Sequence, residues 1–297
     1  MLTFLAPRLA EILGQASHQD LEEVRLRVNK PLVVKTSAGY HFLDKQGRRV
    51  PEKDAYVVSA GEIDSTIQLI TKNSWYAWEE EIRRGYFTVP GGHRVGFCGR
   101  AVLADGKIST VRFISSLTIR LARSVPGCAE PLLGTVCRAG QQVLSTLIIS
   151  PPGCGKTTLL RDLARCISEA GFQVVIIDER SEIAASYRGV PQLDVGPQTD
   201  VLDGYPKAAG AAVAVRALSP QVVVTDEIGH PDDGAALAEL ARCGVKVLAT
   251  CHGESTADVK ARRWVSDCIG VFQLAVILSR RRGPGTVERV LSLSRGT

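Results

Sequence analysis

The stretch Ser150-Pro151-Pro152-Gly153-Cys154-Gly155-Lys156-Thr157-Thr158 decides the fold of this chain. An apolar run from Val143 to Ile149 precedes it, and the helix-like segment Leu159-Leu160-Arg161-Asp162-Leu163-Ala164 follows it. A strand, a loop of small residues, Gly-Lys-Thr and a helix form the context of a phosphate-binding loop of the Walker A type. Ser150 stands where the pattern has its first glycine, and serine is small enough for that position. We therefore predict that residues 150–158 bind the phosphates of a nucleotide.

Each part of this loop has a chemical role. Backbone N–H groups at the start of the helix would hold the phosphates, where the helix dipole favours anions. Lys156 would reach the β- and γ-phosphates, and the Thr157 hydroxyl would coordinate Mg²⁺. A plain Gly/Pro turn before a helix is the alternative, and the second motif below argues against it. Because Cys154 lies inside the loop, bound ATP should protect its thiol from alkylation.

The second motif is Gln221-Val222-Val223-Val224-Thr225-Asp226-Glu227-Ile228-Gly229. Its β-branched run indicates a buried parallel strand with two carboxylates at its C-terminal end, where ligands bind in open α/β sheets. Asp226 would hold Mg²⁺, through water, and Glu227 would polarise the attacking water. Alone, such a strand end could equally be a cap. Downstream of a phosphate loop, it favours a catalytic site.

Composition sets limits on function. The 297 residues suit one large or two medium domains, and the net charge of +5 is too weak to indicate nucleic-acid binding by itself. The eight cysteines include no Cys-x-x-Cys pair, so we expect no zinc site. We expect neither a signal peptide nor a membrane-spanning segment, since no apolar run is long enough. These features favour a reducing compartment that contains ATP.

The chain changes character near residue 125. Residues 1–125 predict a small α+β domain, with a helix over 59–70 capped by Ser59 and Glu62, and with an aromatic cluster that we expect to be core packing. Residues 126–297 alternate strand and helix, which predicts a mainly parallel sheet. The expected N-terminal strands are 23–28, 32–34, 85–89, 93–97, 100–103 and 113–121. The expected C-terminal strands are 143–149, 174–177, 222–225, 245–249, 271–279 and 287–293, and the expected helices are 157–170, 208–218, 233–243 and 259–268.

Further polar groups follow predicted strands of the C-terminal part. Asp178 and Glu179 end one strand, where either could contact Mg²⁺ or the catalytic water, or only cap the next segment. Thr250 and His252 end another, and either could sense the γ-phosphate. The basic turn 279–285 is more typical of a solvated hairpin tip than of a binding patch.

Phosphoryl transfer also needs positive charge on the equatorial oxygens, and a neighbouring subunit often supplies it as an arginine. Arg216, just before the acidic strand, is one candidate. The N-terminal strands carry a series of others, which could act in this way or only form surface charge: Arg94, Arg100, Arg112, Arg120 and Arg123.

Five segments of the chain resemble the stage III sporulation protein AA family of endospore-forming bacteria. They are EVRLRV (23–28), PGGHRVGFCGR (90–100), ISSLTIRLAR (114–123), PPGCGKTTLLRD (151–162) and DERSEIA (178–184). The first three lie outside the nucleotide-binding motifs and are therefore the specific ones. The family is itself similar to the hexameric ATPases of type II and type IV secretion systems.

The resemblance implies a mother-cell ATPase at the cytoplasmic face of a channel between mother cell and forespore. Its partners would be membrane proteins of that channel complex, with peripheral membrane association and no direct nucleic-acid contact. Asp178-Glu179 would correspond to the acidic box of secretion ATPases and Thr250-Cys251-His252 to their His box. Many of those ATPases have Gly-Glu where this chain has Asp226-Glu227, so the resemblance carries over to Glu227 more firmly than to Asp226.

Together these observations predict an α/β fold: a RecA-like P-loop NTPase core at 126–297, and an N-terminal α+β domain at 1–125 that helps to form a homo-oligomeric, hexameric ring. The expected ligands are ATP and Mg²⁺. The alternatives are a nucleic-acid-stimulated RecA-like motor and an assembly scaffold that binds ATP without turnover. The predicted catalytic residues are Glu227, Lys156, Glu179, His252 and Arg120; the predicted metal ligands are Thr157 and Asp226.

Overall fold

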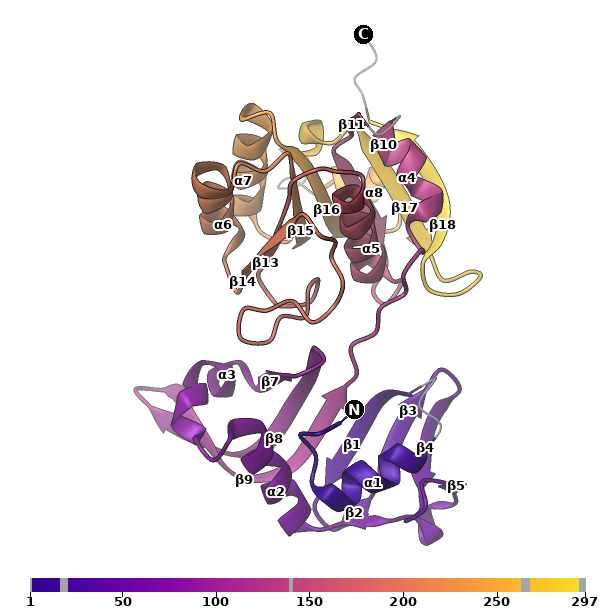
Figure 1. The fold of residues 1–297 in the computed structure, drawn as a ribbon, viewed down its shortest axis with the longest axis vertical. Helices are drawn as coiled ribbons and strands as arrows, with labels where there is room; N and C mark the ends of the chain where they lie inside the picture. Colours follow the sequence, from indigo (N-terminus) through magenta and orange to yellow (C-terminus); the bar gives the residue numbers. More distant parts are fainter. Residues whose placement is uncertain (1, 17–20, 139–140, 263–267, 294–297) are drawn as a thin grey trace. The chain divides into compact units, whose positions relative to one another are not determined.

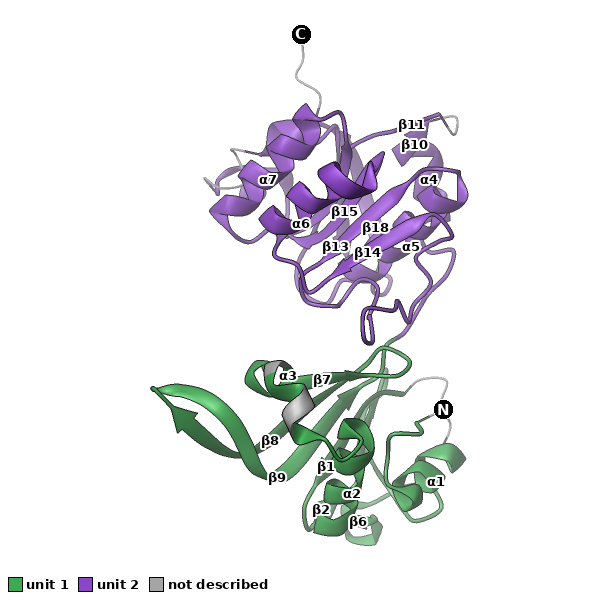
Figure 2. Cartoon of the chain, turned by 60° about the vertical axis from the view of Figure 1, so that its left-hand side comes forward, with its two compact units in different colours: residues 1–122 green, residues 123–297 purple. Residues whose placement is uncertain are grey.

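The computed structural model describes residues 2–16, 21–138, 141–262 and 268–293. The chain divides into two compact units, residues 1–122 and residues 123–297, which Figure 2 colours separately. The change of character near residue 125 lies next to this division. Within the described part of the chain, every helix is too short or too polar to cross a membrane.

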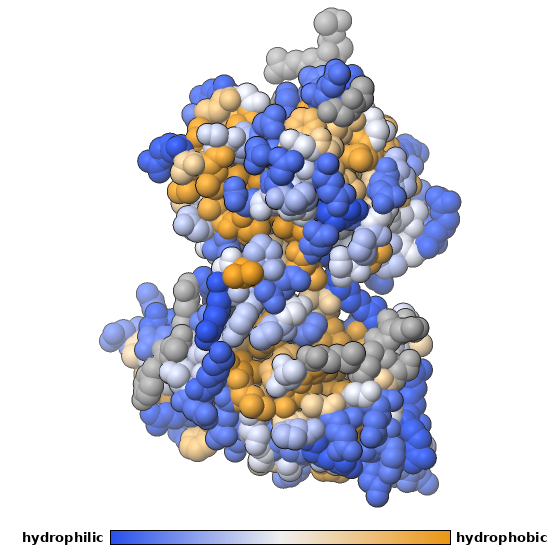
Figure 3. All heavy atoms as spheres, in the orientation of Figure 1, coloured by the Kyte–Doolittle hydropathy of each residue, from blue (hydrophilic) through white to orange (hydrophobic). Residues whose placement is uncertain are grey.

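Unit 1 is built on one antiparallel sheet. Its seven strands are β1 (Leu21–Arg27), β3 (Val33–Thr36), β4 (Gly39–Leu43), β5 (Arg49–Val50), β7 (Tyr86–Val89), β8 (His93–Ala104) and β9 (Lys107–Arg120), in the order β5-β4-β3-β1-β9-β8-β7. Its helices are α1 (Pro7–Gln15), α2 (Ala60–Thr71) and α3 (Glu79–Arg84), and β2 (Lys30–Pro31) pairs with β6 (Val57–Val58). The α+β prediction for this part is confirmed. In Figure 3, hydrophobic residues gather near the middle of unit 1 and hydrophilic residues surround them.

The predicted capping and packing in unit 1 are also confirmed. The Ser59 hydroxyl accepts a hydrogen bond from the Glu62 N–H, and the Glu62 carboxylate accepts one from the Ser59 N–H, which together form a capping box at the start of α2. Trp78 packs edge-on against Phe87 with ring centroids 5.3 Å apart, and Phe87 stacks on Phe97 at 4.8 Å. The aromatic cluster is therefore core packing.

The strand boundaries in the β8–β9 region differ from those predicted. Residues 93–97 and 100–103 belong to one strand, β8, because the pairing with β9 continues on both sides of a register irregularity between Cys98 and Arg100. Its partner β9 begins at Lys107, earlier than the predicted 113. This long hairpin extends beyond the other strands of the sheet (Figure 2).

Unit 2 contains a second seven-stranded sheet. Its strands are β12 (Thr146–Ser150), β13 (Val174–Asp178), β14 (Thr199–Asp203), β15 (Val222–Glu227), β16 (Lys246–His252), β17 (Leu274–Ser279) and β18 (Thr286–Ser292), in the order β14-β13-β15-β16-β12-β17-β18. All neighbours pair in parallel except β17 and β18, which form an antiparallel hairpin. The mainly parallel sheet is thus confirmed.

Helices cover both faces of this sheet (Figure 1). The helices are α4 (Glu130–Val136), α5 (Lys156–Glu169), α6 (Lys207–Val213), α7 (Pro231–Arg242) and α8 (Thr256–Lys260), and a small ladder joins β10 (Cys137–Arg138) to β11 (Gln142–Val143). Side chains of α4 and α5 share one buried cluster with the sheet, and those of α6, α7 and α8 share the other. The central strands are buried on both faces, which explains their continuous apolar sequences.

Three elements of unit 2 differ from the prediction. Strand β14 was not predicted, because Thr-Asp-Val-Leu-Asp is neither an apolar run nor an alternating pattern, and this edge strand is mostly half-buried. Residues 208–218 form α6 followed by a π-helical turn, Ala214–Leu218, rather than one regular helix. Helix α8 spans Thr256–Lys260, whereas the prediction was 259–268, of which residues 263–267 lie outside the described chain.

Candidate functional site: a phosphate loop at the carboxyl edge of the sheet

The predicted phosphate loop, residues 150–158, has a backbone that suits this prediction. Strand β12 ends at Ser150, and α5 begins at Lys156 directly after Gly155, whose φ is +86°. Gly153 also has a left-handed φ of +70°. A side chain at Gly155 would bring its Cβ to 3.0 Å from the backbone nitrogen of Gly285. Both conformation and close backbone approach therefore require glycine at position 155.

Lys156 is held inside this loop. Its ammonium donates to the carbonyl oxygens of Ser150 at 3.3 Å and Pro151 at 3.4 Å, and it lies 2.9 Å from Nδ1 of His252. Burial lowers the pKa of Lys156 below its usual value, against the opposing charge of Glu227. The ammonium thus lies at the mouth of the loop, on the helix N-terminus, where a phosphate would be bound.

His252 connects Lys156 to the acidic strand. Its Nε2 lies 3.0 Å from Oε2 of Glu227. An ammonium can only donate hydrogen bonds, so Nδ1 of His252 must accept from Lys156. The imidazole proton is then on Nε2, the nitrogen that lies next to the Glu227 carboxylate. The three side chains form a continuous polar chain with a defined direction.

The sheet order brings these groups together. Strands β15, β16 and β12 are adjacent, and in the β12–β16 register Ser150 is paired with His252. Glu227 is paired with Thr250, after a register irregularity that follows Val224. A cavity of about 330 Å³ opens at this edge of the sheet. It is lined by loop residues between Pro152 and Thr158 and by Arg180, Glu182, Asp226, Glu227, Thr250 and His252.

Lys207, at the start of α6, bridges two of the other predicted acids. Its ammonium lies 2.7 Å from Oε2 of Glu179 and 2.9 Å from Oδ1 of Asp226. Burial raises the pKa of Asp226 to about 6, although the Lys207 charge opposes this. Burial by itself would lower the pKa of Lys207, but the neighbouring carboxylates outweigh it and raise that pKa. Sequence reasoning missed Lys207, because it began the helix one residue later, in an Ala- and Gly-rich segment.

Asp178 has a structural position. Its carboxylate accepts hydrogen bonds from the N–H groups of Glu182, Ile183 and Ala184. Burial raises its pKa, and these backbone donors oppose that rise. The cap interpretation therefore applies to Asp178, while Glu179 extends toward Lys207 and Asp226.

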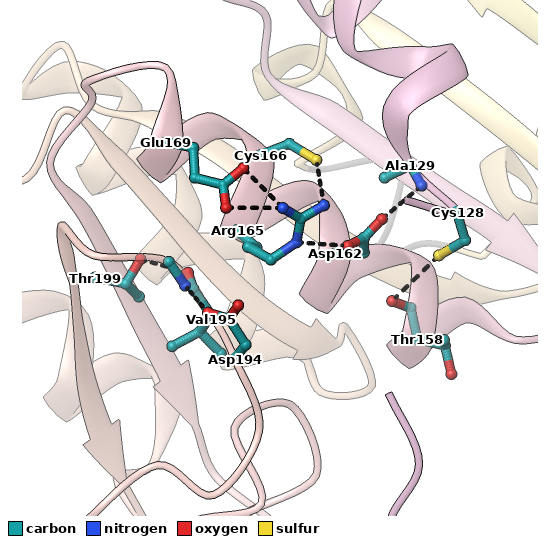
Figure 4. Close-up of polar contacts among 11 residues, drawn as sticks. Cys128, Ala129, Thr158, Asp162, Arg165, Cys166, Glu169, Asp194, Val195 and Thr199 are labelled. Atoms are coloured by element: carbon teal, nitrogen blue, oxygen red, sulfur yellow. Dashed lines mark hydrogen bonds and ion pairs between the residues drawn. The ribbon is translucent and has the colours of Figure 1, made fainter. Parts of the chain in front are cut away.

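Helix α5 is fixed from its other side by a second polar cluster (Figure 4). Asp162 accepts a hydrogen bond from the Ala129 N–H at 2.8 Å and pairs with Arg165 at 2.8 Å. The Cys128 thiol lies 3.9 Å from the Thr158 carbonyl oxygen. The segment that precedes α4 is thereby tied to the first turns of the phosphate-loop helix.

The basic turn 279–285 is closer to the site than sequence reasoning predicted. The N–H of Gly285 donates to the carbonyl oxygen of Cys154 at 2.7 Å. Nη1 of Arg280 lies 3.5 Å from the point that a Cβ on Gly153 would occupy. The hairpin between β17 and β18 therefore contacts the phosphate loop instead of being only a solvated tip.

These residues fit a nucleotide with Mg²⁺. The left-handed glycines shape a cradle that a side chain would fill, and Thr157 and Asp226 supply hard oxygen donors of the kind Mg²⁺ prefers. Thr157 lies in the first turn of α5 and is half-exposed. The Cys154 side chain is only 3% exposed, so its thiol can be alkylated only if the loop opens.

Arg120 lies at the end of β9 in unit 1. Its side chain is 71% exposed, and its Nε lies 3.6 Å from Oε2 of Glu23. The role of Arg120 at a nucleotide site of a neighbouring subunit stays a prediction.

Solved structures of a pilus retraction motor and of an ATPase share this fold. The chain aligns with the pilus retraction motor PilT at a TM-score of 0.60 and 15% identity, over 92% of this chain and 78% of PilT. It aligns with the Legionella pneumophila ATPase DotB at a TM-score of 0.57 and 16% identity, over 86% of this chain and 72% of DotB. These likenesses confirm the predicted fold of a P-loop core with a smaller N-terminal domain.

Sequence relatives identify the family. The chain is 40% identical to stage III sporulation protein AA of Bacillus subtilis (strain 168) over 281 residues, which cover 91% of this chain and 86% of that protein. The family model described as "Sporulation stage III, protein AA" matches residues 1–296. The chain therefore belongs to the sporulation stage III protein AA family.

Proposed function

We propose that this protein is an Mg²⁺-dependent ATPase that acts as a secretion-ATPase-like motor in endospore formation. The observation that carries the proposal is the polar chain from Lys156 through His252 to Glu227 at the mouth of the phosphate loop. It joins a phosphate-binding cation to a carboxylate beside the same cavity. Family membership supports the link to sporulation, and the structural neighbours support the fold of an ATPase.

In this proposal the loop N–H groups and Lys156 bind the β- and γ-phosphates of ATP. Glu227 orients the attacking water and receives its proton, and His252 holds the Glu227 carboxylate in place through Nε2. When bound, Mg²⁺ would neutralise phosphate charge between Thr157 and Asp226. Glu179 and His252 couple the loss of the γ-phosphate to neighbouring elements.

The cellular role is proposed from the family. The motor would act in the mother-cell cytoplasm, peripherally at the channel complex between mother cell and forespore, with membrane proteins of that complex as partners. Unit 1 would help to assemble a hexameric ring, in which Arg120 completes the site of a neighbouring subunit. Such completion in trans is how many P-loop ATPases stabilise the charge of the transition state.

The test is ATP turnover with Mg²⁺ by the purified full-length chain, beside Lys156→Ala and Glu227→Gln. We expect Lys156→Ala to abolish both ATP binding and turnover. Glu227→Gln should lower kcat about 100-fold or more while ATP still binds, because it removes the base and keeps the shape. Gln68→Ala, at an exposed position on α2 of unit 1, serves as a surface control with unchanged turnover.

Other results would favour the other functions. ATP binding without turnover in the wild type at every protein concentration would support a nucleotide-dependent scaffold. Turnover that DNA or RNA stimulates would support a nucleic-acid motor. Normal turnover by Glu227→Gln would remove Glu227 from the catalytic role.

A further inference from the structure

Lys207 is a buried cation that belongs to neither the phosphate loop nor the acidic strand. Its side chain is 7% exposed, and its ammonium contacts one carboxylate on each side, Glu179 at 2.7 Å and Asp226 at 2.9 Å. These acids come from two neighbouring strand ends, after β13 and at the end of β15. A single positive charge therefore lies between two groups that would otherwise repel each other.

The backbone holds this lysine in place. Lys207 is the first residue of α6, and a Cβ on Gly210, one turn later, would lie 2.6 Å from Cγ2 of Ile177 in β13. The glycine thus allows α6 to pack tightly against the sheet at the level of the acids. This close packing directs the start of the helix, and with it the lysine, toward the carboxylates.

Two carboxylates around a compact cation also form the kind of oxygen-donor set that binds a divalent metal. Asp226 is the proposed metal ligand of the ATPase site, and it has Lys207 against one of its oxygens. A divalent cation near Asp226 and the ammonium would repel each other strongly in this partly buried environment. The divalent cation and the Lys207 ammonium therefore cannot both bind the Asp226 carboxylate closely.

We infer that Lys207 is the resident cation of the metal site, which offsets part of the charge of Glu179 and Asp226 in the absence of metal and must release Asp226 when a divalent ion binds. The inference rests on the proposed Mg²⁺-dependent function. It means that free metal binds weakly, because it must displace an internal ion pair. Metal that arrives with nucleotide phosphates brings further ligands and overcomes this competition, and Lys207 then keeps its ion pair with Glu179.

The test is binding of Mn²⁺ to the full-length protein without nucleotide, measured by the electron paramagnetic resonance signal of free Mn²⁺. We expect Lys207→Met to bind Mn²⁺ about tenfold more tightly than the wild type, because the competing charge is gone. Lys207→Arg keeps the charge and should bind as weakly as the wild type. Lys246→Met, at the opposite end of β16, is the matched control for loss of one lysine and should change nothing.

The location of the gained site is tested with Asp226→Asn added to Lys207→Met. The double variant should lose the tenfold gain. Equal Mn²⁺ affinity in Lys207→Met and the wild type would overturn the inference, and so would a gain that survives Asp226→Asn. If Lys207→Met does not fold by circular dichroism, Lys207→Gln, which is neutral and can still donate hydrogen bonds, replaces it with the same expectation.

This measurement is independent of turnover. A tenfold gain in Mn²⁺ affinity together with an inactive wild type would contradict the proposed ATPase function and leave the competition intact. An active wild type with no gain of Mn²⁺ affinity in Lys207→Met would support the proposed ATPase function and overturn the inference about Lys207.

Discussion

Gly155 is a position of the loop that does not accommodate a side chain. Its φ of +86° is unfavourable for any side chain, and a Cβ would lie 3.0 Å from the Gly285 backbone nitrogen. The neighbouring carbonyl of Cys154 accepts the hydrogen bond from that same nitrogen. A side chain at position 155 would therefore separate the loop from the β17–β18 hairpin and move the loop N–H groups that we propose to bind phosphate.

We predict that Gly155→Ala lowers ATP affinity about 100-fold and costs about 1–3 kcal/mol of stability, since both backbone strain and a contact with backbone are introduced. The measurement is nucleotide binding by fluorescence, with unfolding followed by urea titration. Gly134→Ala is the matched control, because Gly134 lies exposed in α4 with open space around it. Alanine there should leave ATP affinity unchanged and be neutral or slightly stabilising. Equal ATP affinity in both variants would contradict this account of the loop.

At the scale of elements, the site follows from strand ends. The sequence predicted β12, β15 and β16 separately, because each combines an apolar run with polar residues at its C-terminal end. Their convergence requires only that parallel strands end at one edge of a sheet. The polar chain from Lys156 to His252 and Glu227 then arises from the adjacency of these strands, which the alternation of strand and helix indicates but does not specify.

What the sequence could not predict depends on contacts between distant segments. Lys207 has no local pattern that distinguishes it from a solvated lysine at a helix start; its partners come from β13 and β15. The sequence of the basic turn 279–285 predicts a solvated hairpin tip. Only the packing of β17 beside β12 brings this turn to the phosphate loop. Strand β14 has half-buried, polar residues because it is an edge strand.

His93 allows a pH prediction for one element, the β8 start in unit 1. Its Nδ1 accepts the N–H of Ala122 at 3.1 Å, and its ring lies 6.1 Å from that of Phe4. Burial lowers the pKa of His93 below its ordinary value. The unfolded chain therefore binds the proton more readily than the folded chain does. The contribution of neutral His93 to the stability of the fold is thus complete above the ordinary histidine pKa of about 6.5, and it is lost as the pH falls below that value.

We predict that His93→Asn, which keeps an acceptor near the Nδ1 position but cannot titrate, removes this part of the pH dependence. Between pH 7.5 and pH 5.5 the unfolding temperature of the wild type should fall by about 2–4 °C more than that of the variant. Differential scanning calorimetry of the full-length chain at the two values measures this. The same fall in both proteins would show that His93 does not contribute.

At the scale of the whole molecule, the two units have different proposed tasks. Unit 2 contains the phosphate loop, the acidic strand and His252. Unit 1 contributes exposed arginines on β8 and β9, of which Arg120 is the one that we assign to a neighbouring site. With that assignment, each chain contributes residues to two sites, its own and that of a neighbour, and activity becomes a property of the assembly.

This division can be tested by complementation between two inactive variants. Arg120→Ala leaves Glu227 intact, and Glu227→Gln leaves Arg120 intact, so each should lose about 100-fold or more of turnover alone. In a mixed ring, a site is complete where Glu227 of an Arg120→Ala chain meets Arg120 of a Glu227→Gln chain. At random mixing in equal amounts about a quarter of the sites qualify, and turnover should recover to about that fraction of the wild-type rate. Arg112→Ala, on the same strand β9, is the control and should be active without a partner. No recovery in the mixture, with both variants still assembling, would mean that Arg120 acts within its own chain or not at all.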